Sequence, residues 1–264
     1  MTDGGAGTAL VTGASSGIGR ELARLLARDG HTLILTARDE ERLRAVAAEL
    51  RERHGTGSTV IAVDLSQPDG AAKLVEQIER AGLTVDVLVN NAGAGAAGPF
   101  AEVPLERQLA VIQLNLVALT ELTRRLLPGM LARRRGRVLN VSSTAAFQPG
   151  PYMAVYYATK AYVLSLSEAI AAEVAGSGVT VTTLCPGPTR TEFFERASMR
   201  KSPLARSSIL DAAAVAEAGY AGMLRGRTLV VPGLTNRVAR HLARLAPRRL
   251  VTGIVARLNA GRRR

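Results

Sequence analysis

The amino-acid sequence predicts an α/β fold: a single doubly wound domain with a seven-stranded parallel sheet and helices on both of its faces. Short apolar runs alternate with longer amphipathic segments, which is the order of repeated strand–helix–strand units. The short runs are apolar at nearly every position, as expected for strands covered by helices on both sides. The chain has 264 residues, 47% of them apolar, so it can bury a large core without cross-links.

Each element follows from its local pattern. The expected strands cover residues 9–12, 32–37, 58–64, 85–90, 137–141, 179–185 and 228–231. The expected helices cover residues 17–29, 40–54, 70–81, 104–132, 153–175 and 212–224. Glycines follow several of these helices just before the next strand, where helices commonly end. We expect this domain to occupy residues 1–232 and a basic helical extension to occupy residues 233–264.

The expected extension carries most of the net charge. The chain has a formal charge of +12, no Asp or Glu follows Glu217, and eleven arginines lie between Arg225 and Arg264. Its spacing predicts two amphipathic helices separated at Pro247. Their apolar stripes contain Val238, Leu242, Leu245, Leu250, Ile254 and Leu258. Three interpretations stay open: a cap on the sheet edge or an oligomer contact, an element drawn to an anionic membrane surface, and a nucleic-acid contact. The lack of interleaved aromatic residues disfavours nucleic acid.

The composition disfavours several other classes of protein. Cys185 is the one cysteine, which excludes a disulfide framework or a multi-cysteine metal site within this sequence. The three histidines are scattered, so we predict no metal. The sequence shows neither a secretory leader pattern nor an apolar run near the ~20 residues that span a bilayer. We therefore expect a cytoplasmic protein.

A glycine-rich turn follows the first strand. Gly13, Gly17 and Gly19 enclose small residues, and a helix begins at once. Unpaired N–H groups at a helix start attract phosphate, and glycine lets phosphate approach the backbone. The alternative is an ordinary tight turn, but its place at the first strand–helix junction is the one that dinucleotide binding requires.

A tyrosine, a lysine and a serine form a candidate catalytic group. Tyr156 and Lys160 are four residues apart in a helical pattern and therefore lie on one face. Ser143 comes directly after the expected strand 137–141, and Asn115 is a polar residue within an apolar helical stripe. Reduction of a carbonyl needs an acid for the oxygen and a second hydrogen bond to it. A nearby ammonium would favour ionisation of a phenol and ease proton transfer.

These blocks together resemble the short-chain dehydrogenase/reductase family, over residues 8 to about 232. The blocks are the glycine turn, Asn90-Asn91-Ala92-Gly93, Asn115, Ser143 with Tyr156 and Lys160, and Pro186-Gly187 with Thr191. The resemblance implies an NAD(P)-binding Rossmann fold and a homo-oligomer. It implies that Tyr156 is the general acid or base and that Ser143 binds the substrate oxygen. It also implies that Lys160 binds the nicotinamide ribose and lowers the pKa of Tyr156, and that Asn115 holds a water for reprotonation.

The resemblance also implies a cofactor site. Its residues would be Gly13, Ser15, Ser16, Gly17, Ile18, Gly19, Arg38, Asp64, Leu65, Asn91, Ala92, Gly93, Tyr156, Lys160, Pro186, Gly187, Thr189 and Thr191. Relatives that use NAD commonly carry an acidic residue at the end of the second strand, where this chain has Ala37 followed by Arg38. A guanidinium suits a 2′-phosphate, so we expect NADPH to be favoured over NAD. Against this, Ser16 stands where some NADP-using relatives have a second basic residue, and Arg38 could instead pair with Glu40 or Glu41.

The expected substrate wall is apolar. It would come from Phe147, Pro149, Met153, Phe193, Phe194 and Met199, with Ser143 and Tyr156 at the reacting oxygen. This lining favours a hydrophobic ketone, aldehyde or secondary alcohol. The function expected from the sequence is thus NADPH-dependent carbonyl reduction. The alternative is a non-catalytic dinucleotide sensor, which would commonly lack the tyrosine or the lysine that this chain retains.

Overall fold

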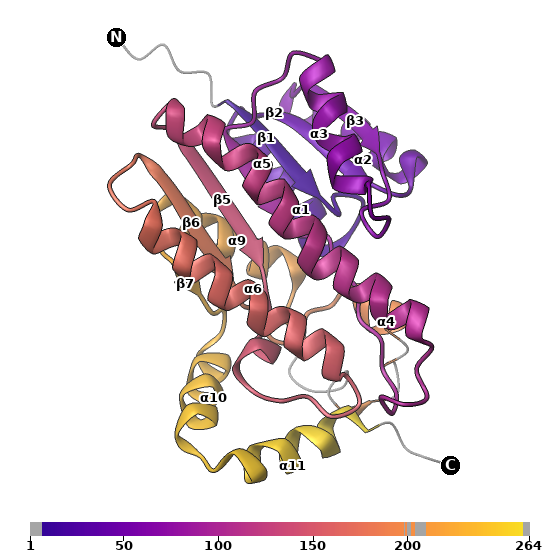
Figure 1. The fold of residues 1–264 in the computed structure, drawn as a ribbon. Helices are drawn as coiled ribbons and strands as arrows, with labels where there is room; N and C mark the ends of the chain where they lie inside the picture. Colours follow the sequence, from indigo (N-terminus) through magenta and orange to yellow (C-terminus); the bar gives the residue numbers. More distant parts are fainter. Residues whose placement is uncertain (1–6, 198, 200–201, 204–209, 261–264) are drawn as a thin grey trace.

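The computed structural model of the protein describes residues 7–197, 199, 202–203 and 210–260 (Figure 1). Seven parallel strands form one sheet in the order β3-β2-β1-β4-β5-β6-β7. The strands are β1 (Thr8–Thr12), β2 (Thr32–Ala37), β3 (Ser58–Ala62), β4 (Val87–Asn90), β5 (Gly136–Val141), β6 (Val179–Leu184) and β7 (Leu229–Val230). The predicted fold class is confirmed, and the predicted strand ends differ by one or two residues.

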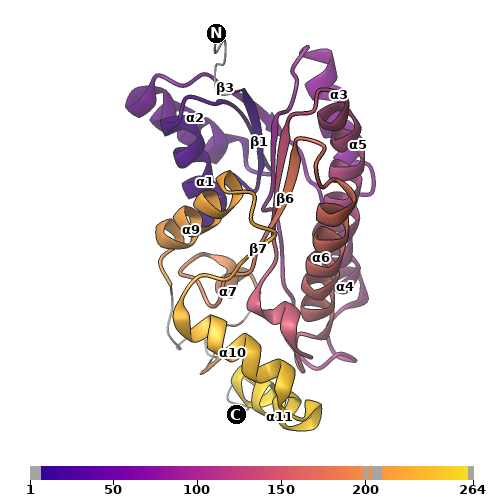
Figure 2. The ribbon, with the colours of Figure 1, turned by 90° about the vertical axis from the view of Figure 1, so that its left-hand side faces the viewer.

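Helices cover both faces of the sheet, and Figure 2 shows the two layers on either side of it. The layer of α1 (Gly17–Arg28), α2 (Glu40–His54) and α9 (Ala212–Leu224) packs on one face. The layer of α3 (Gly70–Arg80), α5 (Leu119–Ala132) and α6 (Ala154–Glu173) packs on the other. The central strand β1 touches both cores, which is why Ala9, Leu10 and Val11 are all fully buried.

The helix predicted over residues 104–132 is continuous but not uniform. It consists of α4 (Leu105–Ile112), the π-helical segment η1 (Gln113–Ala118) and α5. Asn115 lies in the π-helical segment, and such segments are frequent at functional sites. Two short helices, η2 (Thr144–Phe147) and α7 (Phe193–Arg196), were not expected because one turn is too short to show a helical period.

The strand order places a crevice at the end of the sheet where the parallel strands finish. After β3 the chain returns to the other side of β1 and forms β4, so the loops that follow β1 and β4 leave in opposite directions. The carboxyl ends of all seven strands lie at this end of the sheet. The glycine turn, Asn91, Ser143 and Pro186 each follow one of these strands and are therefore brought together there.

Two further helices lie below the carboxyl ends of the strands, as Figures 1 and 2 show: α10 (Leu234–Leu245) and α11 (Arg248–Asn259). They confirm the expected helical extension and its break at Pro247. Val251 and Val255 of α11 pack into a small third core that includes Met153 and Tyr157. The extension is thus joined to the loops around the crevice. No helix in the described part of the chain is both long and apolar enough to cross a membrane.

Candidate active site

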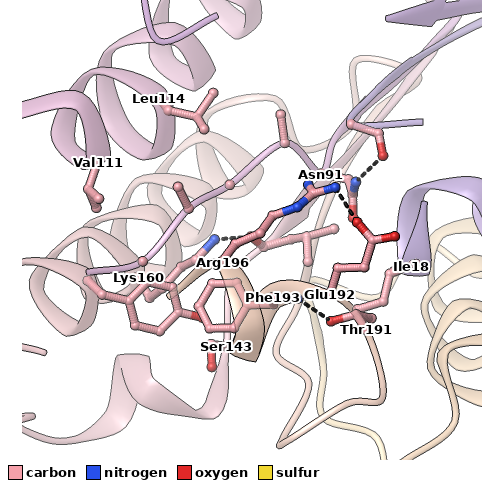
Figure 3. Close-up of a pocket in the computed structure, with 18 of the residues that line it drawn as sticks. Ile18, Asn91, Val111, Leu114, Ser143, Lys160, Thr191, Glu192, Phe193 and Arg196 are labelled. Carbon is pink, nitrogen blue, oxygen red and sulfur yellow. Dashed lines mark hydrogen bonds and ion pairs between the residues drawn. The ribbon is translucent and has the colours of Figure 1, made fainter. Parts of the chain in front are cut away.

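A cavity of about 620 Å³ lies at the carboxyl ends of the strands (Figure 3). It is lined by the glycine turn, by the residues that follow β2 to β6, and by side chains from α4, α6, α7 and α11. All the site residues expected from the sequence line this cavity except Gly19, Asn115, Phe147 and Pro149.

The glycine turn leaves the start of α1 open. Gly13 and Gly17 have φ values of +66° and +56°, which only glycine adopts at little cost. A Cβ on Gly19 would lie 2.3 Å from the carbonyl oxygen of Gly13, so this third glycine allows the turn to close and does not need to touch a ligand. The N-cap residue Ser16 makes no side-chain hydrogen bond to the helix. The first N–H groups of α1 are therefore free of a side-chain cap, as an anion site requires.

Asn91 fixes the turn against the neighbouring strand. Its Nδ2 donates to the carbonyl oxygens of Thr12 (2.9 Å) and Gly13 (3.2 Å). The Thr12 hydroxyl accepts from the N–H groups of Asn91 and Ala92 at 3.0 and 2.9 Å. The side chain of Asn91 thus holds the glycine turn in shape, a role that the expected cofactor contact alone did not reveal.

The candidate catalytic side chains converge on the cavity. Tyr156 and Lys160 come from α6, and the Lys160 Nζ lies 5.8 Å from the centre of the Tyr156 ring. Ser143 follows β5, and its hydroxyl is 3.4 Å from the carbonyl oxygen of Pro186. The neighbouring serine, Ser142, donates to the backbone oxygen of Lys160 at 2.8 Å and is buried. Of the two serines, Ser143 is therefore the one whose hydroxyl lies beside the Tyr156 phenol.

Burial dominates the protonation of both titratable groups in the protein itself. Burial raises the pKa of Tyr156 well above its usual value, and a hydrogen bond with Ser143 opposes this only in part. Burial lowers the pKa of Lys160 to about 8, and its Nζ donates to the carbonyl oxygen of Val141 at 2.9 Å. The expected lowering of the Tyr156 pKa by Lys160 is not found in the protein itself: burial raises this pKa, and the group that lowers it is Ser143.

Asn115 supports the site from behind. Its side chain is buried; Nδ2 donates to the Ala94 carbonyl (2.9 Å) and to the Thr159 hydroxyl (3.0 Å). Its Oδ1 accepts from the Ala94 N–H at 2.9 Å. These bonds occupy the amide and tie η1 to the loop after β4 and to α6. They also hold Asn115 beside Lys160, since both lie 3.4 Å from the position that a Cβ on Gly93 would take.

The part of the expected cofactor site that would bind a 2′-phosphate contains two arginines. Arg38 lines the cavity and forms no ion pair with Glu40 or Glu41; Glu40 pairs with Arg44 instead. Arg42, which the sequence analysis missed, also lines the cavity. The alternative pairing for Arg38 is therefore not formed, and a second cation stands near it, on the first turn of α2.

Two acidic residues face these arginines. Burial works against ionisation of Asp64, but hydrogen bonds from Ser66 and the charge of Arg38 hold its pKa below the usual value. Glu192, on the loop after β6, accepts from Arg42 at 3.0 and 3.1 Å and also pairs with Arg196. Figure 3 shows the Glu192 carboxylate turned toward Arg196; with Arg42, Glu192 forms an ion-pair bridge. This bridge joins α2 to the segment that begins α7.

The other end of the cavity is apolar. Met153, Phe193, Phe194 and Met199 line it as expected, and the ring centres of Phe193 and Tyr156 are 5.1 Å apart. Phe147 and Pro149 do not line it. The expectation for Phe147 is wrong because η2 turns its ring toward α10, where the guanidinium of Arg240 lies 5.5 Å from the ring centre.

The apolar lining residues that were not expected include Val111, Leu114, Val255 and Leu258. The first two belong to the helix across the cavity and the last two to α11. Their periodicity was visible, but sequence spacing alone does not tell which neighbour a helix faces. Cys185 lies beneath the site, and burial raises its pKa to about 12, as expected for a core residue and not for a nucleophile.

Comparisons with known proteins place this geometry in a family. A family model for short chain dehydrogenases matches residues 7–202. The granaticin polyketide synthase ketoacyl reductase 1 of Streptomyces violaceoruber is 43% identical over 192 residues, covering 71% of this chain and 70% of the relative. A short-chain dehydrogenase from Sphingobium yanoikuyae, solved in complex with NADPH, is 33% identical with a TM-score of 0.82; the match covers 98% of this chain and 99% of that one.

A second solved structure is similar over nearly the same length. The bulky-bulky ketone specific alcohol dehydrogenase from Comamonas testosteroni is 30% identical with a TM-score of 0.77, and the match covers 92% of this chain and 94% of that one. The family model spans well over half of the chain, and the folds agree along most of it. The chain therefore belongs to the short-chain dehydrogenase family and is an oxidoreductase.

Proposed function

We propose that this enzyme reduces a hydrophobic ketone or aldehyde with NADPH, and runs in reverse as an alcohol dehydrogenase. The observation that carries the proposal is the division of one cavity into two chemically different ends. One end has the open start of α1 with Arg38 and Arg42, and the other has the apolar wall around Phe193. Tyr156 lies where the two ends meet.

The residues of the cavity fit a bound dinucleotide. The glycine turn gives a diphosphate access to uncapped N–H groups. Arg38 offers a guanidinium to a 2′-phosphate, which supports NADPH over NADH, and Arg42 adds positive charge beside it although Glu192 pairs with it. When bound, the reduced nicotinamide supplies the hydride.

The chain's own side chains then carry out the proton transfer. Burial keeps the Tyr156 phenol protonated at neutral pH, which is the form needed to donate a proton to the carbonyl oxygen during reduction. Ser143 donates a second hydrogen bond to that oxygen as negative charge grows on it. Lys160 lies close enough to stabilise the phenolate that remains, and the Asn115 contacts hold this lysine in place.

Tyr156→Phe tests the proposal. We expect the variant to bind NADPH as the wild type does, because the phenol hydroxyl is the one group removed. We expect its kcat for ketone reduction to fall by roughly 100-fold or more, the usual range for loss of a general acid. Reduced-nicotinamide absorbance against a panel of ketones and aldehydes gives the rate, and calorimetry gives the affinity.

The matched control is Tyr157→Phe, which removes a neighbouring hydroxyl that donates to Asn259 and not to the reacting group. Equal turnover by Tyr156→Phe and the wild type would refute the catalytic role. A wild type that binds NADPH, turns over no carbonyl of the panel and binds a protein partner when loaded with NADPH would favour the sensor hypothesis.

Assembly into a homo-oligomer and residence in the cytoplasm are part of the same proposal. Light scattering after size-exclusion chromatography measures the mass of the assembly, and fractionation of cells that make the protein measures its location. A monomeric mass at all working concentrations would remove the first expectation.

A further inference from the structure

The two C-terminal helices expose an unusual amount of apolar surface. In the described part of the chain, twelve large hydrophobic side chains are exposed, and seven of them lie on α10 and α11. These seven are Leu234, Val238, Leu242, Leu245, Leu250, Ile254 and Leu258. We call them the apolar face of the extension. Such a concentration of exposed apolar side chains in two short helices marks an interaction surface.

The orientation of α10 is the reverse of an ordinary surface helix. At about 100° per residue, its leucine and valine stripe lies roughly opposite the side that carries Asn236 and Arg240. That polar side faces the body of the protein: Asn236 sits against Gly187, and Arg240 lies over the Phe147 ring. The apolar stripe faces away, and Leu245 is 85% exposed. A helix normally turns its apolar stripe to the core, so this one is arranged to meet something else.

The charges around the apolar face indicate what that partner is. Arg237, Arg248, Arg249 and Arg257 are exposed on the same two helices, and none of them forms an ion pair within the described residues. No acidic residue follows Glu217. Two copies of the extension facing each other would bring arginines together without a carboxylate from either helix. An anionic lipid surface offers both apolar depth and the opposite charge.

We propose that α10 and α11 dock on an anionic membrane surface, with the apolar face at the boundary between headgroups and acyl chains and the arginines among the headgroups. The same helix α11 walls the apolar end of the cavity with Val255 and Leu258. Leu258 also belongs to the apolar face, with an exposure of 37%. The docked surface and the wall of the substrate pocket therefore meet at this residue. The docking does not depend on the reduction proposed above, because vesicle binding is measured without cofactor or substrate.

Vesicle flotation of the full chain tests the docking without any substrate. We expect the protein to float with vesicles of equal parts phosphatidylglycerol and phosphatidylcholine and to stay behind with phosphatidylcholine alone. High salt should release it, because the attraction to headgroups is screened. Leu242→Ser with Leu245→Ser should weaken binding by roughly tenfold or more, since both side chains lose favourable burial. Arg248→Gln with Arg249→Gln should weaken it by about tenfold to thirtyfold on the anionic vesicles.

Leu224→Ser is the matched control, because Leu224 is another exposed leucine that lies away from the extension. It stands at the end of α9, just before β7 begins, at the amino ends of the strands. It should bind vesicles as the wild type does. No binding to anionic vesicles, or equal binding by the wild type and both double variants, overturns the proposal. So does self-association that disappears in Leu242→Ser with Leu245→Ser while vesicles bind neither protein, because the face would then join two copies. Vesicle binding by a protein that reduces no carbonyl would leave the docking standing and refute only the proposed reaction.

Discussion

Lys160 is a cation that the fold buries at a cost. Its pKa falls to about 8 in the folded protein because burial disfavours the charged form, whereas an exposed lysine titrates near 10.5. Between these values the unfolded chain binds more protons than the folded chain, so stability should rise with pH there. Below about pH 8 both states are protonated, and the whole cost of burying the charge is present.

Replacing this lysine with a neutral residue of similar length should therefore stabilise the fold. A shift of this size corresponds to about 3 kcal/mol, from which the lost hydrogen bond to Val141 takes about 1 kcal/mol. We expect Lys160→Met to gain about 2 kcal/mol in the free energy of unfolding at pH 7 and to lose that gain by about pH 10.5. The substitution should also abolish activity at either pH. Urea unfolding at the two pH values measures this. Lys73→Met, which removes an exposed lysine, should change stability little at either pH.

Arg38 should decide which cofactor the enzyme prefers. It lines the cavity without an ion pair to its acidic neighbours, so its guanidinium is available to a 2′-phosphate. We expect Arg38→Ala to weaken NADPH binding by roughly tenfold to 100-fold and NADH binding by less than about twofold. Calorimetric titration with both cofactors gives the two Kd values. Arg44→Ala, another arginine of the same region that pairs with Glu40, should change neither; an equal loss for NADPH and NADH in Arg38→Ala would contradict the assignment.

Among the elements, the bridge between α2 and the loop before α7 connects two parts of the cavity. Arg42 and Glu192 are about half exposed, so their ion pair contributes at most about 1 kcal/mol to stability. Its effect on binding should be larger, because the Glu192 carboxylate occupies the guanidinium that would otherwise bind the 2′-phosphate and also repels that phosphate.

Glu192→Gln should therefore tighten NADPH binding by about two- to fivefold and leave NADH binding nearly unchanged. The melting temperature should stay close to that of the wild type. Fluorescence titration of the reduced nicotinamide measures both affinities. Glu40→Gln removes an equal charge from α2 that pairs with Arg44, and it serves as the control. Weaker NADPH binding by Glu192→Gln would show that the bridge positions Arg42 for the phosphate and does not compete with it.

The elements also show how far the sequence could lead. The strands and the long helices were predictable, because their apolar periods extend over many residues. The π-helical turn at Asn115 was not, because no local pattern marks it and the residues that bond to this amide, Ala94 and Thr159, lie far from it in sequence. The glycine turn and Ser143 could be placed because each directly follows a strand. Phe147 could not, since a single turn of helix decided which way its ring points.

At the scale of the whole molecule, the extension closes the domain. Val255 is buried against Met153 and Tyr157, and Asn259 accepts a hydrogen bond from the Tyr157 hydroxyl at 3.3 Å. Asn259 also donates to the Pro151 carbonyl at 3.0 Å. The last helix is thus held against Tyr157, next to the candidate catalytic residue Tyr156. The charge and stripes of the extension were readable from the sequence, but this contact with the pocket was not.

Because α11 walls the pocket, a change on this helix should alter substrate recognition and leave the cofactor untouched. Leu258 lines the apolar end of the cavity, whereas Leu250 lies two turns earlier on the same helix and does not. We expect Leu258→Ala to raise the KM for a bulky apolar ketone by roughly fivefold to tenfold, since about 1 kcal/mol of apolar contact is lost in both ground and transition states. The Kd for NADPH should not change, and Leu250→Ala should leave both values at those of the wild type. Steady-state rates over a series of ketones of increasing size measure the effect. The rise in KM should grow with the size of the ketone if α11 forms the far wall of the site. A KM that is the same in both variants for every ketone would place the substrate elsewhere in the cavity.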